Sequence, residues 1–382
     1  MVQYFNIFDK GGILGLELVN ISHRETELKE HHIKEAKKVF GYVVGCSVIM
    51  LALLFFITAV QDKLIGTVID ILSSIFGWLV SSLSSASFEQ SYNQVFSVLN
   101  TETFILIINI IVSLITTVLP YFVFAKLMHI KPSSAFKLNT DVPRRFWLYI
   151  PFSIGAGYIV NFIVIIVFGD SFDVFRELPQ EVYMPSSPSS IILYYVLAAF
   201  IPAIFEEWAF RGLVLRSLMP YGRSFALISS SVIFGLMHID PPQVIFATVF
   251  GLLAGFIYIK TGSIWYGTLI HLVNNSLSLN VAFVSNFGGS ISLGVFIIGL
   301  LAIILMITAV VGIAYFSSTG FFKNRVLYSV TPPSKPVIST RQYFGLSLAS
   351  ISTIIFICLY ISLLIYTYFF DWFLKLWTTF FS

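Results

Sequence analysis

A chain of 382 residues that is 57% hydrophobic and only 11% charged differs from soluble domains, in which about a quarter of the residues are charged. Its formal net charge of +3 gives no reason to expect a nucleic acid as partner. Cys46 and Cys358 both lie in apolar stretches, so neither a disulfide framework nor a cysteine metal site is indicated. The composition indicates a multi-pass integral protein of the cell membrane, surrounded by the lipid bilayer.

Apolar stretches of about 20 residues, the length that crosses a bilayer, recur along the whole chain. They lie at 40–60, 103–125, 147–168, 190–215, 264–285, 291–316 and 343–370, with shorter candidates at 225–239 and 243–259. The stretch 64–83 is apolar but carries Asp70 and several serines, so it is either re-entrant or interfacial. We therefore predict an all-α, polytopic transmembrane helix bundle of about eight to nine spans.

Lysine and arginine are concentrated in alternate connections between these stretches, which predicts a cytoplasmic N-terminus by the positive-inside rule. The basic positions are Arg24, Lys29, Lys34, Lys37, Lys38, Lys126, Lys131, Lys137, Arg144, Arg145, Arg216, Arg223, Lys260, Lys323, Arg325, Lys335 and Arg341. The connections 61–102 and 169–189 are poor in lysine and arginine and hold several acidic residues instead. These two connections are therefore expected on the outer face.

Ionisable side chains within the predicted spans, with two amides that accompany the last of them, lie between residues 206 and 275. Such groups are costly in lipid, so each one is a candidate functional residue. They are Glu206, Glu207 and Arg211 in FEEWAFRG, His238 in FGLMH, and His271, Asn274 and Asn275 in HLVNN.

Helix geometry suggests which of these side chains pair. Glu207 and Arg211 are four residues apart and can form an ion pair on one face. Glu206 is rotated by about 100° from Glu207, so it projects elsewhere without Arg211 and is suited to be a general base. His271 and Asn275 also share a face, because they are four residues apart.

Depth in the membrane agrees for two of the three helices. Counted from the basic residues that flank the spans, Arg216 for Glu206 and Lys260 for His271, both side chains lie about 15 Å deep at 1.5 Å per residue. His238, counted from Arg223, lies about 22 Å deep. A tilted or irregular helix at 225–239 would close this gap, and the break at Asp240-Pro241-Pro242 favours irregularity. We expect the polar residues to meet in a water-filled cavity that opens to the cytoplasm, with Leu213 and Gly267 accessible from that side.

One carboxylate, two imidazoles and an amide can hydrolyse an amide bond. The carboxylate takes a proton from water, the imidazoles position that water, hold a metal or donate to an oxyanion, and the amide completes the polarising shell. A serine or cysteine protease is a weaker interpretation, because the cysteines lie far from the cluster and Ser229–Ser231 have no G-x-S-x-G setting.

At these residues the chain resembles the CPBP family of intramembrane endopeptidases (CAAX protease and bacteriocin-processing, or Abi). The family pattern is EExxxR, then FxxxH, then HxxxN or HxxxD. Here Glu206-Glu207-xxx-Arg211, Phe234-xxx-His238 and His271-xxx-Asn275 match in order. The resemblance covers about 190–285 and extends to FGLLAGFIYIKTGSIWYGTLIH at 250–271. The flanking spans are not diagnostic of the family, and we divide the chain into a cytoplasmic N-terminal segment at 1–39, transmembrane spans at 40–185, a CPBP catalytic core at 186–288, and C-terminal transmembrane spans with a tail at 289–382.

The resemblance also implies roles for the six residues. Glu206 would activate the attacking water, and Glu207 with Arg211 would brace the site. His238, His271 and Asn275 would bind a metal or stabilise the oxyanion. A zinc ion held by His238 and His271 is one alternative, although two histidines and an amide are few ligands for zinc, which prefers four.

Other interpretations stay open at this point. The residues can be interhelical contacts only, the chain can be a transporter, or it can be a catalytically silent scaffold or immunity protein on the same fold. A transporter is disfavoured because the sequence has no inverted repeats. For a protease, the expected partner is a membrane-associated peptide or protein, either of CAAX type or a bacteriocin or signal peptide.

Overall fold

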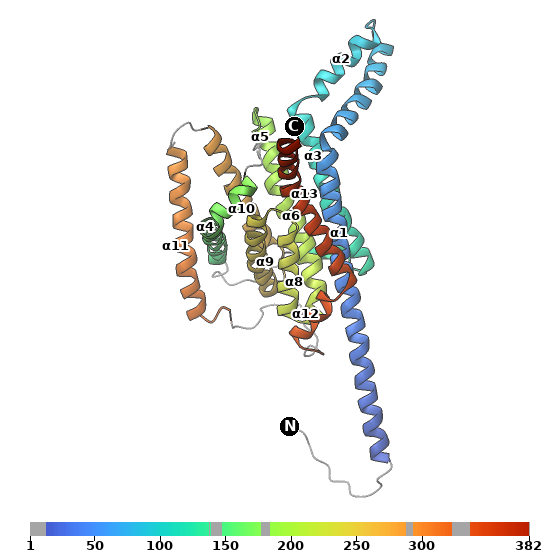
Figure 1. Cartoon of the computed structure of the whole chain (residues 1–382), viewed down its shortest axis with the longest axis vertical. Coiled ribbons are helices and arrows are strands. Elements are labelled where there is room, and N and C mark those ends of the chain that lie inside the picture. Colours follow the sequence, from blue (N-terminus) through green and yellow to red (C-terminus); the bar gives the residue numbers. More distant parts are fainter. Residues whose placement is uncertain are drawn as a thin grey trace.

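The protein is a bundle of helices (Figure 1). The computed structural model describes residues 13–136, 138, 147–176, 184–287, 293–322 and 337–381, and no strand occurs within these ranges. This confirms the predicted all-α, polytopic class.

The first helix is the longest element. Helix α1 runs without interruption from Ile13 to Leu83, 71 residues or about 105 Å at 1.5 Å per residue, whereas a bilayer core is about 30 Å thick. The stretch 64–83 is therefore neither a re-entrant loop nor a separate interfacial element, but the continuation of α1. No glycine or proline interrupts the chain at 61–63, which accounts for the unbroken helix.

Helix α2 (Phe88–Leu99) folds back on this continuation and forms a helical hairpin with it, beyond the rest of the bundle (Figure 1). The Tyr92 hydroxyl donates a hydrogen bond to Asp70 of α1 at 3.1 Å. Ser87 begins α2 with a capping box that includes Gln90. Helix α3 (Glu102–Leu127) then returns into the bundle.

The remaining elements follow in chain order. They are η1 (Pro132–Phe136), α4 (Tyr149–Arg176), α5 (Pro188–Tyr195), η3 (Val196–Phe200), α6 (Ile201–Glu207), η4 (Trp208–Leu215), α7 (Arg216–Leu218), η5 (Met219–Tyr221), α8 (Arg223–Leu236), α9 (Pro241–Thr261), α10 (Trp265–Phe287), α11 (Leu293–Ser318), α12 (Thr340–Leu348) and α13 (Ile351–Phe381). Elements α5 to η5 form one nearly continuous helical rod.

Seven helical stretches in the described ranges are long and apolar enough to cross a membrane, and an eighth is added if the bent pair α12 and α13 counts as one span. Two of the seven, Arg24–Ile57 and Ala59–Leu83, lie end to end on α1. Helix α8 is apolar but short. These helices make the protein a multi-pass integral membrane protein.

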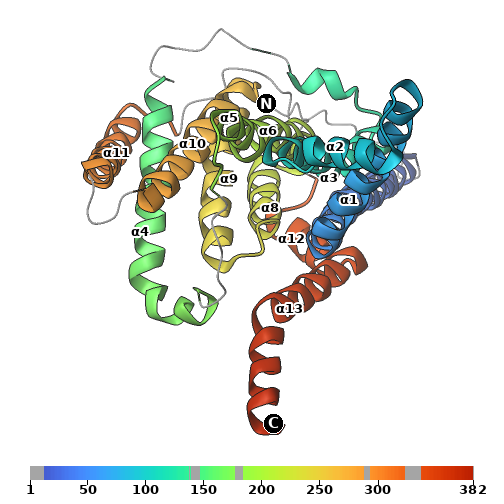
Figure 2. The ribbon, with the colours of Figure 1, turned by 90° about the horizontal axis from the view of Figure 1, so that it is seen from above.

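Helices α4 and α11 lie side by side at one edge of the bundle (Figure 2). Glycine allows them to approach closely: a Cβ on Gly312 of α11 would lie 2.6 Å from the Phe152 ring of α4. Small residues at such contacts are a general device of membrane helices. The outer side of α11 exposes large apolar residues such as Phe296 and Ile307, as expected of a helix that faces lipid.

The two ends of the bundle are defined by contacts between distant segments. At one end the rings of His32 on α1 and Tyr221 lie 5.2 Å apart, and those of Tyr221 and Tyr343 on α12 lie 5.9 Å apart. At the other end Glu102 of α3 accepts hydrogen bonds from Ser186, just before α5. We call the end with His32, Tyr221 and Tyr343 the basic end, and the end with Glu102 and Ser186 the α2 end.

Candidate active site

The two adjacent glutamates lie between two π-helical segments of the central rod. Glu206 and Glu207 end α6, which is preceded by the π-helix η3 and followed by the π-helix η4. Short π-helical segments occur often at functional sites. They shift the helical register on both sides of this pair, which changes the faces presented by the flanking residues.

Glu207 is completely buried and forms an ion pair with Arg211. Arg211 Nη1 lies 2.9 Å from Glu207 Oε1, and both side chains are almost inaccessible to solvent. The guanidinium also lies over the Phe234 ring, with its Cζ 4.5 Å from the ring centroid, and donates from Nη2 to the Gly251 carbonyl at 3.4 Å. The ion pair predicted from the four-residue spacing is confirmed.

His271 of α10 contacts both glutamates. Its Nδ1 lies 3.3 Å from Glu207 Oε1, and its Nε2 lies 3.9 Å from Glu206 Oε2. The approach of α10 to the rod depends on Gly267, where an added Cβ would lie only 2.6 Å from Glu207 Oε2. The imidazole is therefore held between a buried, arginine-paired carboxylate and a second carboxylate that is more accessible.

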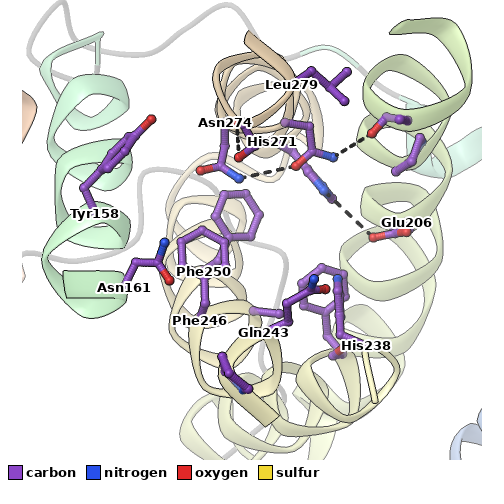
Figure 3. Close-up of a pocket in the computed structure, with 17 residues that line it drawn as sticks. Tyr158, Asn161, Glu206, His238, Gln243, Phe246, Phe250, His271, Asn274 and Leu279 are labelled. Atoms are coloured by element: carbon purple, nitrogen blue, oxygen red, sulfur yellow. Dashed lines mark hydrogen bonds and ion pairs between the residues drawn. The ribbon is translucent and has the colours of Figure 1, made fainter. Parts of the chain in front are cut away.

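Glu206 faces a cavity of about 460 Å³. Figure 3 shows its side chain directed toward His271, with Tyr158 and Asn161 of α4 on the opposite side. The cavity is lined by Tyr158, Asn161, Ala198, Pro202, Glu206, Phe234, His238, Pro242, Gln243, Phe246, Ala247, Phe250, His271, Asn274, Asn275, Ser278 and Leu279. Its walls are thus aromatic, aliphatic and uncharged polar side chains around one carboxylate and two imidazoles.

His238 reaches the cavity from the end of α8. The helix ends at Leu236, and His238 is followed by Ile239 with a positive φ of 59° and by Asp240, which caps α9. His238 Nδ1 lies 3.1 Å from the Phe234 carbonyl oxygen, which orients the ring. The expected irregularity at the end of this short helix is confirmed, and it brings His238 to the same cavity as Glu206.

Asn275 lies one turn beyond His271 on α10 and also lines the cavity. Its Nδ2 donates to the Ala198 carbonyl at 3.4 Å, and its Oδ1 accepts from Asn274 Nδ2 at 3.3 Å. The Ala198 carbonyl belongs to the π-helix η3, so the irregular helix supplies a partner for the amide.

Five of the seven candidate residues from the sequence therefore share the cavity wall: Glu206, His238, His271, Asn274 and Asn275. Glu207 and Arg211 lie buried behind it. The expectation for Leu213 and Gly267 is wrong, since Leu213 is fully buried and Gly267 packs on Glu207. The sequence gives no signal for Tyr158 and Asn161, because no charged residue or histidine lies in their span at 147–168.

The side chains present do not fit a catalytic zinc site. Within the described ranges, no group of three or more His, Cys, Asp or Glu side chains is placed to hold a metal ion. Catalytic zinc takes three protein ligands as a rule. In each histidine Nδ1 faces a protein oxygen, the Phe234 carbonyl for His238 and Glu207 for His271, so the two rings together offer only two nitrogen ligands, one Nε2 from each. We therefore derive no step through a metal.

Comparison with known proteins points to the same segment. Residues 188–277 match the family model described as type II CAAX prenyl endopeptidase Rce1-like. Over 90 residues the chain is 31% identical to the Bacillus subtilis (strain 168) protein named "Putative membrane peptidase YdiL", a match that covers 23% of this chain. The chain thus spans about a third (36%) of the length of this curated relative. No solved structure matches the chain. Residues 188–277 are thus similar to this family model, in agreement with the resemblance seen in their motifs.

Proposed function

We propose that the protein is an intramembrane endopeptidase that hydrolyses a peptide bond of a membrane-associated peptide or protein, with Glu206 as general base. One observation carries this proposal above the others. Of two adjacent glutamates, Glu207 is buried with Arg211 and His271, whereas Glu206 lines the cavity. The family match and the peptidase name of the relative support the reaction class.

The proposed reaction begins with a water molecule held between Glu206 and His271 Nε2. These two groups lie 3.9 Å apart, and a small outward movement of the Glu206 side chain would make room for a water that contacts both. Glu206 takes a proton from this water while the water oxygen attacks the substrate carbonyl carbon. The C–N bond then breaks, and the proton held by Glu206 passes to the leaving amine. The products are a carboxylic acid and an amine, so atoms and charge balance.

In this proposal the buried pair positions His271. When Nδ1–H of His271 donates to Glu207, Nε2 carries no proton and faces the cavity as an acceptor for the attacking water. Arg211 pairs with Glu207 at 2.9 Å and fixes its carboxylate in place. Glu207 and Arg211 are thus positioning residues that do not touch substrate.

His238 and Asn275 are placed to stabilise the oxyanion that forms on the substrate. His238 Nδ1 donates to the Phe234 carbonyl, so only Nε2 is available to contact the oxyanion. Nε2 donates a hydrogen bond there when both ring nitrogens carry a proton. Asn275 Nδ2 donates to Ala198 in the free protein and can turn its second N–H toward the cavity. Removing one such donor typically costs about 100- to 1000-fold in rate.

The lining favours cleavage within a chain over removal of terminal residues. Among the described residues that line the cavity, none is lysine or arginine, the side chains that pair with a free carboxylate. Asn161, Gln243 and Asn274 instead offer donors and acceptors for the backbone of an extended peptide.

The test compares membrane and secreted peptides of cells that make the unchanged protein with those of cells that make Glu206→Gln. A peptide fragment that is lost with Glu206→Gln, together with accumulation of its uncleaved precursor, identifies the substrate. Identical peptide populations at equal protein levels would favour a silent scaffold or immunity protein on the same fold.

A further inference from the structure

The cavity residues occupy corresponding parts of four of the helices that surround it. On α9 they lie between Pro242 and Phe250, in the first half of the helix, and on α10 they lie between His271 and Leu279, well after its start. On the central rod they lie at or before Glu206, and on α8 they lie at or beyond its last turn.

On all four of these elements the lining residues lie on the side of the α2 end. The rod ends, α8 begins, α9 ends and α10 begins at the basic end, near Arg216, Arg223 and Lys260. The opposite halves of these helices hold the cavity. At the α2 end Tyr195 of α5 donates to Asn280 of α10 at 2.9 Å, one residue beyond the last lining residue, Leu279.

Between Glu206 and the basic end, the bundle is closed by buried side chains. Leu213, Val214 and Ile270 are completely inaccessible, and Thr261 and Ser263 at the turn from α9 to α10 are also inaccessible. The first turn of the rod past Glu206 therefore leads into packed protein and not into water.

A short helix covers this closed end from outside. The indole N–H of Trp208 donates to the Pro132 carbonyl at 3.1 Å, and that of Trp265 donates to the Phe136 carbonyl at 2.9 Å. Helix η1 is thus attached at both ends across the rod and α10. Contact is tight between them, because a Cβ on Gly212 would lie 2.6 Å from the Cβ of Ala135 in η1.

The charge distribution assigns this closed end to the cytoplasm. Described basic residues at or near it include Lys131, Arg216, Arg223 and Arg341, and the N-terminal part of α1 lies at the same end through the contact of His32 with Tyr221. Lysine and arginine concentrate on the cytoplasmic side of membrane proteins.

We propose that the cavity of Glu206 and His271 opens on the extracytoplasmic side of the membrane and that its substrate is an extracytoplasmic segment of a membrane-associated peptide or protein. This inference rests on the proposed function only for the nature of the substrate. It replaces the cytoplasmic opening expected from the sequence, and it excludes a cytoplasmic, prenylated chain end as the substrate.

The test is thiol labelling of single cysteines with a charged, membrane-impermeant reagent, in a chain with Cys46→Ala and Cys358→Ala. Ser278→Cys and Gln243→Cys report on the cavity from two helices, α10 and α9, and both positions are exposed. Ser84→Cys, at the exposed tip of the α1–α2 hairpin, is the outer reference, and Ser133→Cys, exposed in η1, is the inner reference.

In intact cells both cavity cysteines should be labelled to the same extent as Ser84→Cys, while Ser133→Cys is labelled only after permeabilisation. Cavity cysteines that follow Ser133→Cys would overturn the proposal, as would cavity cysteines that stay unlabelled under both conditions. Glu206→Gln in the same background should label identically. Labelling needs no turnover, so its outcome is separate from that of the peptide comparison that tests proteolysis.

Discussion

Glu206 and Glu207 are neighbours in the chain but lie in opposite environments. Glu207 is completely buried and lies 2.9 Å from Arg211, whereas the Glu206 side chain is 19% exposed and lines the cavity. The His271 ring lies between them, with Nδ1 on Glu207 and Nε2 toward Glu206. One carboxylate is thus fixed in a buried ion pair, while the other faces the cavity.

Replacing Glu206 by glutamine should abolish proteolysis with little effect on folding. The amide is nearly isosteric with the carboxylate but cannot take a proton from water, and a general base contributes about 100- to 10,000-fold to a rate. Cleavage of a substrate found by peptide comparison is the measurement, with Glu89→Gln on the exposed start of α2 as the matched control. Unchanged cleavage by Glu206→Gln would refute the assigned role.

Breaking the buried ion pair should destabilise the protein. Arg211→Met leaves the Glu207 carboxylate buried without its partner, which typically costs about 3–5 kcal/mol of unfolding free energy. The double variant Glu207→Gln/Arg211→Met should lose less than the sum of the two single variants, because neither charge is then left alone. Unfolding in detergent micelles measures all three.

The exposed pair Glu35 and Lys38 is the control for this measurement. Its atoms are 3.8 Å apart and its side chains are 41% and 53% exposed, so Lys38→Met should cost less than about 1 kcal/mol. Strictly additive losses for Glu207 and Arg211 would show that the pair is not coupled, against the geometry.

Gly267 should not tolerate even a methyl group. In Gly267→Ala the new Cβ would lie 2.6 Å from Glu207 Oε2, and the ion pair with Arg211 prevents that carboxylate from moving away. Overpacking of this kind costs about 1–3 kcal/mol. We expect lower thermal stability and lower activity from the displacement of α10 and its His271.

Gly299→Ala on α11 is the matched control, since nothing lies within 4 Å of a Cβ at that position. Alanine is favoured over glycine inside a helix by about 0.5–1 kcal/mol, so this variant should be unchanged or slightly more stable. Equal losses at Gly267 and Gly299 would mean that the contact with Glu207 has no special weight.

Local patterns in the sequence predicted much of the fold and half of the site geometry. The stretches 103–125 and 243–259 correspond closely to α3 (Glu102–Leu127) and α9 (Pro241–Thr261), because apolar length and flanking turn residues are local signals. The ion pair of Glu207 with Arg211 followed from helical spacing alone. The proposed division into four segments, with a catalytic core at 186–288, stays a prediction.

Features that depend on packing between distant segments could not be predicted. Asn161 of α4 and Gln243 of α9 reach the cavity only because their helices meet α10, and neither residue has a neighbour in the sequence that marks it. The depth of Glu206 could be estimated from helical rise, but not which end of the bundle is closed. That depends on η1 and on the two tryptophans that bind it.

Removal of metal ions should leave activity unchanged. In the described part of the chain, no third His, Cys, Asp or Glu side chain joins His238 and His271 in a metal-binding arrangement. If Glu206 were the third zinc ligand, it would not be available for its proposed role as base. Activity after exhaustive chelation and elemental analysis of the active protein together provide the measurement. His271→Ala should lose activity whether or not metal is added, because it removes the imidazole that we propose orients the attacking water. About one zinc per active chain, lost in proportion to activity on chelation and restored with it, would instead require a metal mechanism and a different role for Glu206.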